Sequence, residues 1–207
     1  MANSRSPRSE DTDRAARKRL LDGAVRQVAS IGAAEVALSD IARDAGVSKA
    51  LIHYHFVDKD TLLARVIEHL VQSIVTREEA ALAQYENEHS PLAVDALWAW
   101  LDDELRRGDI RVLLELDAYR GAAVRSAART AAARRLAAAE QTVTRLFTVL
   151  DLRPRVEPSL MATVFLAFVD GLAFRWELDG RDEASASAPA PRVAFDVFWL
   201  AMLSLAE

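Results

Sequence analysis

The segment LSDIARDAGVSKALIHYHFVDKDTLL (residues 38–63) constrains the fold more than any other part of the chain, because two short stretches with apolar faces flank one glycine. Ala42 lies four residues before Gly46, and Ile52 lies six residues after it. Where two helices cross closely, the first needs a small inner side chain, the turn favours a residue that tolerates positive φ, and the second needs a branched apolar residue. The spacing therefore predicts a helix-turn-helix, with Phe56 completing its small core.

The rest of the chain also favours helices. Alanine and leucine are abundant, whereas the 207 residues include only seven glycines and six prolines. Hydrophobic residues make up 51% of the chain, enough to bury a substantial core. Apolar residues at helical spacing, with glycine, proline and capping residues between them, predict an all-α protein of about nine helices. The expected helices cover approximately residues 13–31, 39–45, 49–56, 59–85, 91–107, 110–119, 124–150, 159–178 and 192–205.

The second helix of the motif is predicted to begin after the N-cap Ser48 and to present a mixed polar and aromatic face. Ile52 and Phe56 are four residues apart and share the buried side, so the intervening HYH fans around the rest of the helix. Polar groups on this face can reach phosphates, its rings can lie against sugars, and its small apolar groups can touch a thymine methyl. The candidate DNA contacts are Ser39, Ser48, Lys49, Ala50, Leu51, His53, Tyr54, His55 and Lys59.

The distribution of charge is compatible with a nucleic-acid contact, although the whole chain carries a net charge of −5. Residues 1–60 contain ten basic and nine acidic residues, and the remainder contains sixteen and twenty-two. The acidity therefore lies in the C-terminal part, and the N-terminal part can still present a basic face to phosphates. Arg5 and Arg8 are further candidates, although a solvated tail is the favoured interpretation of their segment.

The stretch GVSKALIHYHFVDKDTLL resembles the DNA-binding signature of the tetracycline-repressor (TetR) family, which reads approximately G-V-S-x-G/A-x-hydrophobic-Y-x-H/Y-F-x-x-K-x-x-L. One position departs from this pattern, because His53 stands where the family usually has tyrosine; a histidine can still donate to a phosphate. The resemblance is specific over about residues 14–65, and FVDGLAFRW resembles the penultimate helix of many members. The matching residues are Gly46, Val47, Ser48, Ala50, Ile52, His55, Phe56, Lys59 and Leu62.

The resemblance implies a homodimer whose subunits each carry a three-helix DNA-binding head and a helical body that binds a small effector. We accordingly expect a flexible arm over residues 1–12, a helix-turn-helix head over 13–60, and an effector-binding and dimerisation bundle over 61–207. Two recognition helices would enter successive major grooves about 34–36 Å apart, or somewhat farther, on a near-palindromic operator of double-stranded DNA. The expected function is a ligand-responsive transcriptional regulator, with repression favoured over activation or regulation without a ligand.

In the body, aromatic and apolar residues are candidates for an effector pocket or simply for core, and an apolar or aromatic effector is expected. The last two expected helices are candidates for a four-helix dimer interface. Asp117 and Asp170 lie inside apolar helices and need partners, as pocket or structural groups, with a structural role favoured for Asp170. The candidate pocket residues are Trp98, Leu101, Tyr119, Phe147, Phe165, Phe168 and Trp176. The candidate interface residues are Val164, Phe168, Gly171, Leu172, Arg175, Phe198, Trp199 and Met202.

Other kinds of site receive little support. The chain has no cysteine, which excludes a disulfide framework and a thiolate metal site, and no cofactor is expected. His53 and His55 are two residues apart on a helix and point in different directions, so we expect no metal site. The N-terminus lacks the apolar region of a signal peptide, so a cytoplasmic protein is expected. Charged residues interrupt the apolar run 159–178, which is expected at a subunit interface and not across a membrane.

An enzyme is not expected, because the sequence contains no glycine-rich phosphate loop after a strand, no G-x-S-x-G motif and no HExxH motif. One alternative of another class stays open, namely a helical ligand-binding or enzymatic protein whose helix-turn-helix is only structural. Replacing Lys49 and Tyr54 by alanine discriminates between the two, since loss of DNA binding with an intact fold excludes this alternative.

Overall fold

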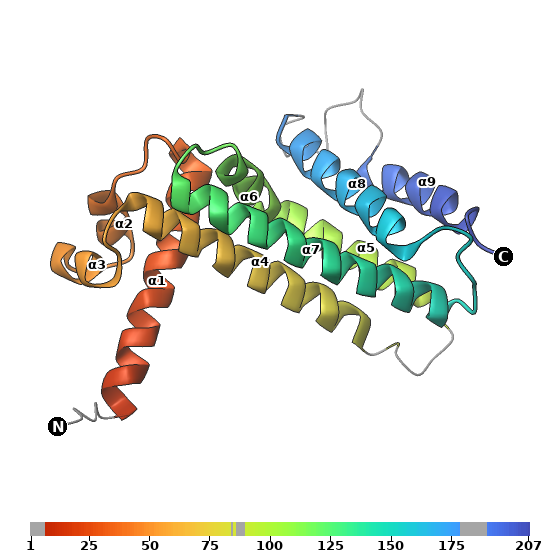
Figure 1. Ribbon diagram of the computed structural model, residues 1–207, viewed down its shortest axis with the longest axis horizontal. Helices are drawn as coiled ribbons and strands as arrows, with labels where there is room; N and C mark the ends of the chain where they lie inside the picture. The colour runs from red at the N-terminus through yellow and green to blue at the C-terminus, as the bar shows by residue number, and fades with distance from the viewer. Residues whose placement is uncertain (1–6, 84, 86–89, 179–189) are drawn as a thin grey trace. The chain divides into compact units, whose positions relative to one another are not determined.

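Nine α-helices and no β-strand make up the part of the chain that the computed structural model describes, which is residues 7–83, 85, 90–178 and 190–207. The predicted all-α fold is confirmed (Figure 1). The helices are α1 (Pro7–Ile31), α2 (Leu38–Asp44), α3 (Lys49–His55), α4 (Lys59–Ala83), α5 (Leu92–Arg107), α6 (Asp109–Asp117), α7 (Ala122–Val149), α8 (Pro158–Leu178) and α9 (Pro191–Leu203). An antiparallel bridge joins Pro154 to Ala206 near the C-terminus.

The helices group into two compact units. The first unit holds residues 1–69 and 115–128, and the second holds residues 70–114 and 129–207. The first unit thus extends beyond residue 60, and it includes the segment between α6 and α7 as well. Residues 7–12, which the sequence suggests as part of a flexible arm, are the first turns of α1. Arg5 and the side chain of Arg8 lie outside the described part.

In the first unit, α2 packs against α1, and α3 packs against α2 (Figure 1). The predicted N-caps of α3 and α4 are confirmed, because the Ser48 hydroxyl accepts the Leu51 amide at 3.1 Å and Asp58 accepts the Thr61 amide at 2.7 Å. The second of these hydrogen bonds lowers the pKa of Asp58. Ser39 is not a cap, because α2 begins one residue earlier and its N-cap, Ala37, makes no side-chain bond.

In the second unit, α8 packs against both α5 and α9 (Figure 1). Three phenylalanines from α7, α8 and α9 are completely buried there, namely Phe147, Phe165 and Phe195. Helix α8 is, over Pro158–Trp176, long and apolar enough to cross a membrane, although only 28% of that segment is buried within the protein. Core and interface helices of soluble proteins are often equally long and apolar, so length and composition alone do not identify α8 as a membrane span.

Candidate functional site

The turn between α2 and α3 has the geometry that the sequence predicts. Gly46 adopts the left-handed conformation with φ of 64°, and the Val47 amide donates to the Ala42 carbonyl at 2.9 Å. A side chain at Gly46 would be strained by this backbone conformation. Ala42, Ile52 and Phe56 are all buried beneath the turn. The helix-turn-helix core is therefore confirmed.

The outer face of α3 is open to solvent. Lys49, Ala50, His53 and Tyr54 are exposed, with 59% of Tyr54 accessible, whereas Leu51 is half-buried. Lys49 forms no ion pair with any residue of the described part. An ammonium, an imidazole and a phenol therefore stand on one short helix, where each can donate to a phosphate oxygen or a base edge.

His55 does not belong to this outer face, contrary to the prediction. It follows Ile52 by three residues and so shares the buried side of α3. Its side chain is only 6% exposed, and its Nε2 lies 3.4 Å from the Asp13 carboxylate of α1. The Tyr54 ring meets the His55 ring edge-on, with 5.2 Å between the ring centroids. His55 therefore supports α3 against α1 and orients Tyr54.

Lys59 is also turned inward. Its Nζ donates to the Ala34 carbonyl at 2.6 Å and lies 5.7 Å from the centroid of the Tyr119 ring. A phosphate contact would compete with both interactions, so Lys59 is a poor candidate for the predicted phosphate contact. Tyr119, a candidate pocket residue, belongs to the first unit and not to the body.

Residues 115–121, which we call the linking segment, belong to the first unit and contact its other residues at two more places. The Glu115 carboxylate accepts the Ala33 amide, just past the end of α1, at 2.5 Å. Burial raises the pKa of the Tyr119 hydroxyl, and the charge and hydrogen bond of Asp60 raise it further. Gly121 leaves no room for a Cβ, because that atom would lie 2.6 Å from Cγ of Asp60. The sequence does not predict these interactions. Its only indication of a close approach is Gly121, which stands directly before α7.

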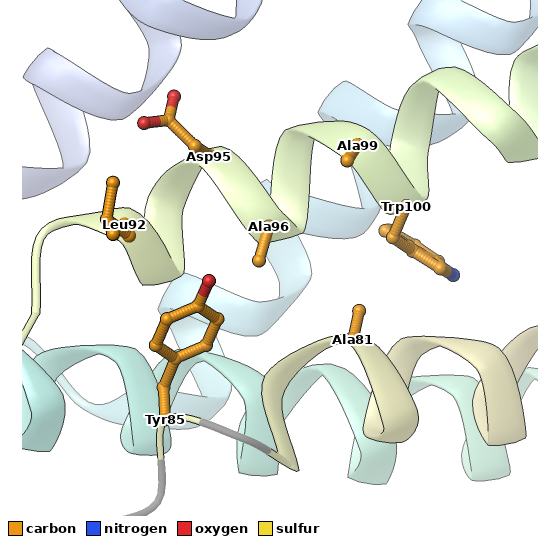
Figure 2. A pocket seen from close by; sticks show the side chains of 7 residues that line it. All are labelled: Ala81, Tyr85, Leu92, Asp95, Ala96, Ala99 and Trp100. Carbon is orange, nitrogen blue, oxygen red and sulfur yellow. The ribbon is translucent and has the colours of Figure 1, made fainter. Parts of the chain in front are cut away.

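The second unit contains an open groove of about 450 Å³ between α4 and α5. Figure 2 shows Tyr85 at one end of this groove and the ring of Trp100 at the other, with the methyl groups of alanines between them. Asp95 at the rim pairs with Arg192 of α9 at 2.7 Å. The groove is lined by Ala81, Tyr85, Leu92, Asp95, Ala96, Ala99 and Trp100.

None of the predicted pocket residues lines this groove. Leu101, Phe147 and Phe165 are fully buried core residues of the second unit. Trp98 packs beside Phe195, with 5.3 Å between the ring centroids. Phe168 stacks on the half-buried Phe198 at 4.2 Å. Trp176 is half-buried, and its indole nitrogen is buried without a hydrogen-bond partner in the part of the chain that the structure describes. Core packing, the alternative that the sequence left open, accounts for most of these residues.

Two arginines organise carboxylates within the second unit. Arg77 binds Glu104 through two hydrogen bonds and Asp109 at 2.7 Å, and these contacts raise its pKa. Arg135 binds Asp170 through two hydrogen bonds, of 2.5 Å and 3.2 Å, and thereby joins α7 to α8. Asp170 thus makes a structural ion pair, the role favoured for it from the sequence, whereas Asp117 is exposed at the end of α6.

Helices α8 and α9 expose a row of large apolar side chains. Val164, Val197 and Leu200 are 46%, 63% and 67% exposed. The full set on this face, which we call the α8–α9 face, is Leu160, Val164, Phe174, Val193, Val197 and Leu200. Of the other predicted interface residues, Gly171 and Arg175 are exposed, and Leu172 is half-buried.

Two predicted interface residues are misplaced. Trp199 and Met202 are only 4% and 2% exposed, since they face the core of their own unit. The opposite side of α9 carries the exposed residues. The prediction was wrong because a helix with apolar residues on several faces gives no sign of which face points outward. No group of His, Asp or Glu side chains in the described part has an arrangement that holds a metal ion.

Comparison with known proteins agrees with this geometry. Residues 20–66 match the family model of bacterial regulatory proteins of the tetR family. The transcriptional regulator BetI of Agrobacterium fabrum is 30% identical over 177 residues, which cover 84% of this chain and 82% of that protein. The chain belongs to the TetR family. BetI of Brucella canis is 35% identical over 77 residues, which cover 37% of this chain and only 39% of that relative.

Solved structures of TetR-type regulators share the fold of this chain. A candidate TetR-family regulator from Rhodococcus sp. superposes with a TM-score of 0.71 at 17% identity, over 92% of this chain and 98% of that protein. SmeT, solved with triclosan, gives 0.66 at 19% identity over 90% and 91%. FadR of Bacillus subtilis, solved with stearoyl-CoA, gives 0.65 at 17% over 89% and 97%. At these identities the likeness establishes the fold of this TetR-family regulator and not its ligand.

Proposed function

We propose that this TetR-family regulator is a repressor that binds a near-palindromic operator as a homodimer and leaves it when a small effector binds. The observation that carries the proposal is the exposed face of α3, where Lys49, His53 and Tyr54 stand on a rigid helix-turn-helix core. Such donors on the second helix of this motif suit the major groove. The regulator would act on DNA in the cytoplasm.

The α8–α9 face supports the dimer. Exposed patches of large apolar side chains on a soluble protein mark contact surfaces. Two such helices from each subunit would form a four-helix interface and cover the apolar residues that make α8 resemble a membrane span. Phe174, Val197 and Leu200 are the most exposed apolar residues at this proposed interface, and they take the place of Trp199 and Met202.

The second unit is the proposed effector-binding body. Its groove between α4 and α5 is lined mainly by alanine and aromatic side chains. SmeT and FadR, which share the fold, were solved with triclosan and with stearoyl-CoA, and this supports a ligand-binding body in this chain as well. Effector and operator must then oppose each other, and each must weaken the other by the same factor.

In this proposal, effector binding in the second unit is coupled to the DNA-binding head through α4, which runs through both units, and also through the linking segment. Helices α6 and α7 begin or continue in the second unit, yet the residues between them hold Ala33 and Asp60 of the first. A ligand that favours one arrangement of α6 and α7 would change these contacts and shift the population of DNA-binding heads. No new contact between ligand and DNA-binding head is required.

Selection from a pool of random DNA duplexes tests the proposal. We expect the purified protein to enrich a near-palindrome, and the Lys49→Ala and Tyr54→Ala variants to lose that enrichment while keeping the helical circular-dichroism signal. Lys18→Ala serves as a matched control, because Lys18 is an exposed cation that pairs with Asp22 on α1. A folded wild-type dimer that enriches no duplex would instead favour the alternative in which the helix-turn-helix is only structural.

A further inference from the structure

Glu78 of α4 is a carboxylate buried inside the second unit without full compensation. Only 4% of the residue is exposed; its side chain is hydrogen-bonded with Thr142, but its Oε1 has no hydrogen-bond partner in the described part of the chain. Its position continues the apolar stripe of α4, since it follows the buried Ile74 by four residues. A leucine would fill this position at no electrostatic cost, whereas an unpaired buried acceptor lowers the free energy of unfolding. The carboxylate therefore calls for a partner.

Around Glu78 the carboxylates outnumber the arginines that could neutralise them. Arg135 of α7 acts on it, but the two hydrogen bonds of that guanidinium go to Asp170. Glu104 of α5 and the adjacent Glu79 repel it, and both oxygens of Glu104 are already held by Arg77. Arg77 and Arg135 thus face the four carboxylates of Glu78, Glu104, Asp109 and Asp170, since Arg107, which also acts on Glu104, is paired with Asp103. A further cation would improve this balance of charge.

Two residues that line the groove between α4 and α5 lie one helical turn from Glu78 or from its neighbour Glu104. Ala81, which lines the groove, follows Glu78 by three residues and shares its side of α4. Trp100, which also lines the groove, precedes Glu104 by four residues on α5. Figure 2 shows the indole nitrogen of Trp100 pointing away from Tyr85, and this nitrogen is buried without a hydrogen-bond partner among the described residues. The apolar end of the groove therefore lies one helical turn from the charged residues.

We propose that Glu78 anchors a binding site for an apolar molecule that carries a protonated amine. The ammonium donates to the unpartnered Oε1 of Glu78, and the apolar part occupies the groove beside Trp100 and Ala81. The aromatic face of Trp100 is a further favourable neighbour for a cation. This inference rests on the proposal that the second unit binds the effector, and it narrows the expected effector to amines.

Binding at this site is expected to depend on pH. Burial raises the pKa of Glu78 to about 7, against the lowering effects of Thr142 and Arg135, while the charges of Glu79 and Glu104 raise it further. Between pH 6 and pH 8 the ionised fraction of such a group increases about tenfold. An alkylamine stays protonated throughout this range, because its pKa resembles that of lysine at about 10.4. Its affinity should therefore increase about tenfold with the ionisation of Glu78.

Isothermal titration of the full-length protein, without DNA, tests the proposal with phenylethylamine, phenylpropylamine and phenylbutylamine and their matched alcohols. We expect the best amine to bind at least tenfold more tightly than its alcohol at pH 8. The same amine should bind about tenfold more weakly at pH 6 than it does at pH 8. Glu78→Gln should remove this preference and its pH dependence and leave alcohol binding unchanged. Glu79→Gln is the matched control, since Glu79 is the exposed neighbour.

Equal affinity for amine and alcohol, no binding of any amine, or unchanged amine binding by Glu78→Gln would each overturn the proposal. The wild-type comparison of amine with alcohol decides the question even if a variant does not fold. These measurements involve no operator, so they can succeed while operator selection fails. Conversely, an enriched operator without amine binding would uphold the regulator and remove only this ligand class.

Discussion

At the scale of single residues, the protonation of Glu78 should control part of the stability. Its pKa is raised from 4.5 to about 7 by burial, so the folded state binds the proton more tightly than the unfolded state does. The free energy of unfolding therefore falls as the pH rises from 4.5 to 7, and the loss is at most about 3 kcal/mol above that range. Glu78→Gln keeps the shape and removes the ionisation, so the variant should be more stable than wild type at pH 8.

Urea unfolding at fixed protomer concentration, at several pH values between 5 and 8, measures this difference directly. The gap in unfolding free energy between Glu78→Gln and wild type should shrink toward pH 5, while Glu79→Gln should keep the pH dependence of wild type, moved slightly to lower pH because one charge that raises the pKa of Glu78 is gone. A gap that stays constant over this range would show that the Glu78 carboxylate does not titrate in it.

Gly121 is a further residue whose identity the structure explains. An alanine Cβ would lie 2.6 Å from Cγ of Asp60, so Gly121→Ala should displace Asp60 and cost about 1–3 kcal/mol of unfolding free energy. In an Asp60→Ala background the obstacle is gone, and the same substitution should be neutral or stabilising. Thermal unfolding of the four proteins forms a double-mutant cycle. Equal costs of Gly121→Ala in both backgrounds would place the strain elsewhere.

At the scale of elements, local chemistry explains what the sequence predicted well. The small Ala42, the turn glycine Gly46 and the caps Ser48 and Asp58 act over a few residues, and the structure confirms all of them. His55 and Lys59 were misplaced because their partners, Asp13 and Ala34, lie on other elements more than twenty residues away along the chain. Helix periodicity gives the direction of a side chain but not the element that meets it.

The two lysines near α3 should consequently behave differently on DNA. If Lys49 binds one phosphate, Lys49→Ala should reduce the slope of log affinity against log salt by about 0.9 per subunit, which is roughly twice that value in a homodimer. Lys59→Ala should lower affinity by removing the hydrogen bond to the Ala34 carbonyl but leave the slope unchanged. Salt titrations on the selected operator give both slopes. A smaller slope for Lys59→Ala would mean that its ammonium leaves Ala34 for a phosphate.

At the scale of the whole molecule, periodicity could not predict which helices share a unit. The linking segment begins about thirty residues after the end of α4, yet it belongs to the first unit through Glu115, Tyr119 and Gly121. In the second unit, α8 and α9 are apolar on more than one side, so the sequence indicated an interface but not the face that forms it. Long-range packing buried Trp199 and left Leu200 exposed.

The two sides of α9 should therefore respond differently to substitution. Val197→Glu combined with Leu200→Glu places two charges on the exposed α8–α9 face, so we expect folded monomers with much weaker operator binding. Leu92→Glu is the matched control, because Leu92 is 57% exposed on α5 and is not one of the residues of this face. Trp199→Ala should instead cost about 3–5 kcal/mol of unfolding free energy, as expected for a buried tryptophan. Sedimentation velocity and urea unfolding separate these outcomes.

A double variant that stays dimeric would place the subunit interface elsewhere. In that case the apolar residues that α8 exposes would need another partner, since contiguous exposed apolar side chains mark contact surfaces. If the variant becomes monomeric and still binds the operator with unchanged affinity, dimer geometry does not position the two heads. If the dimer and operator binding are lost together, dimerisation through α9 is required for DNA binding through α3. Simultaneous contact with two half-sites increases affinity only while the two subunits are connected.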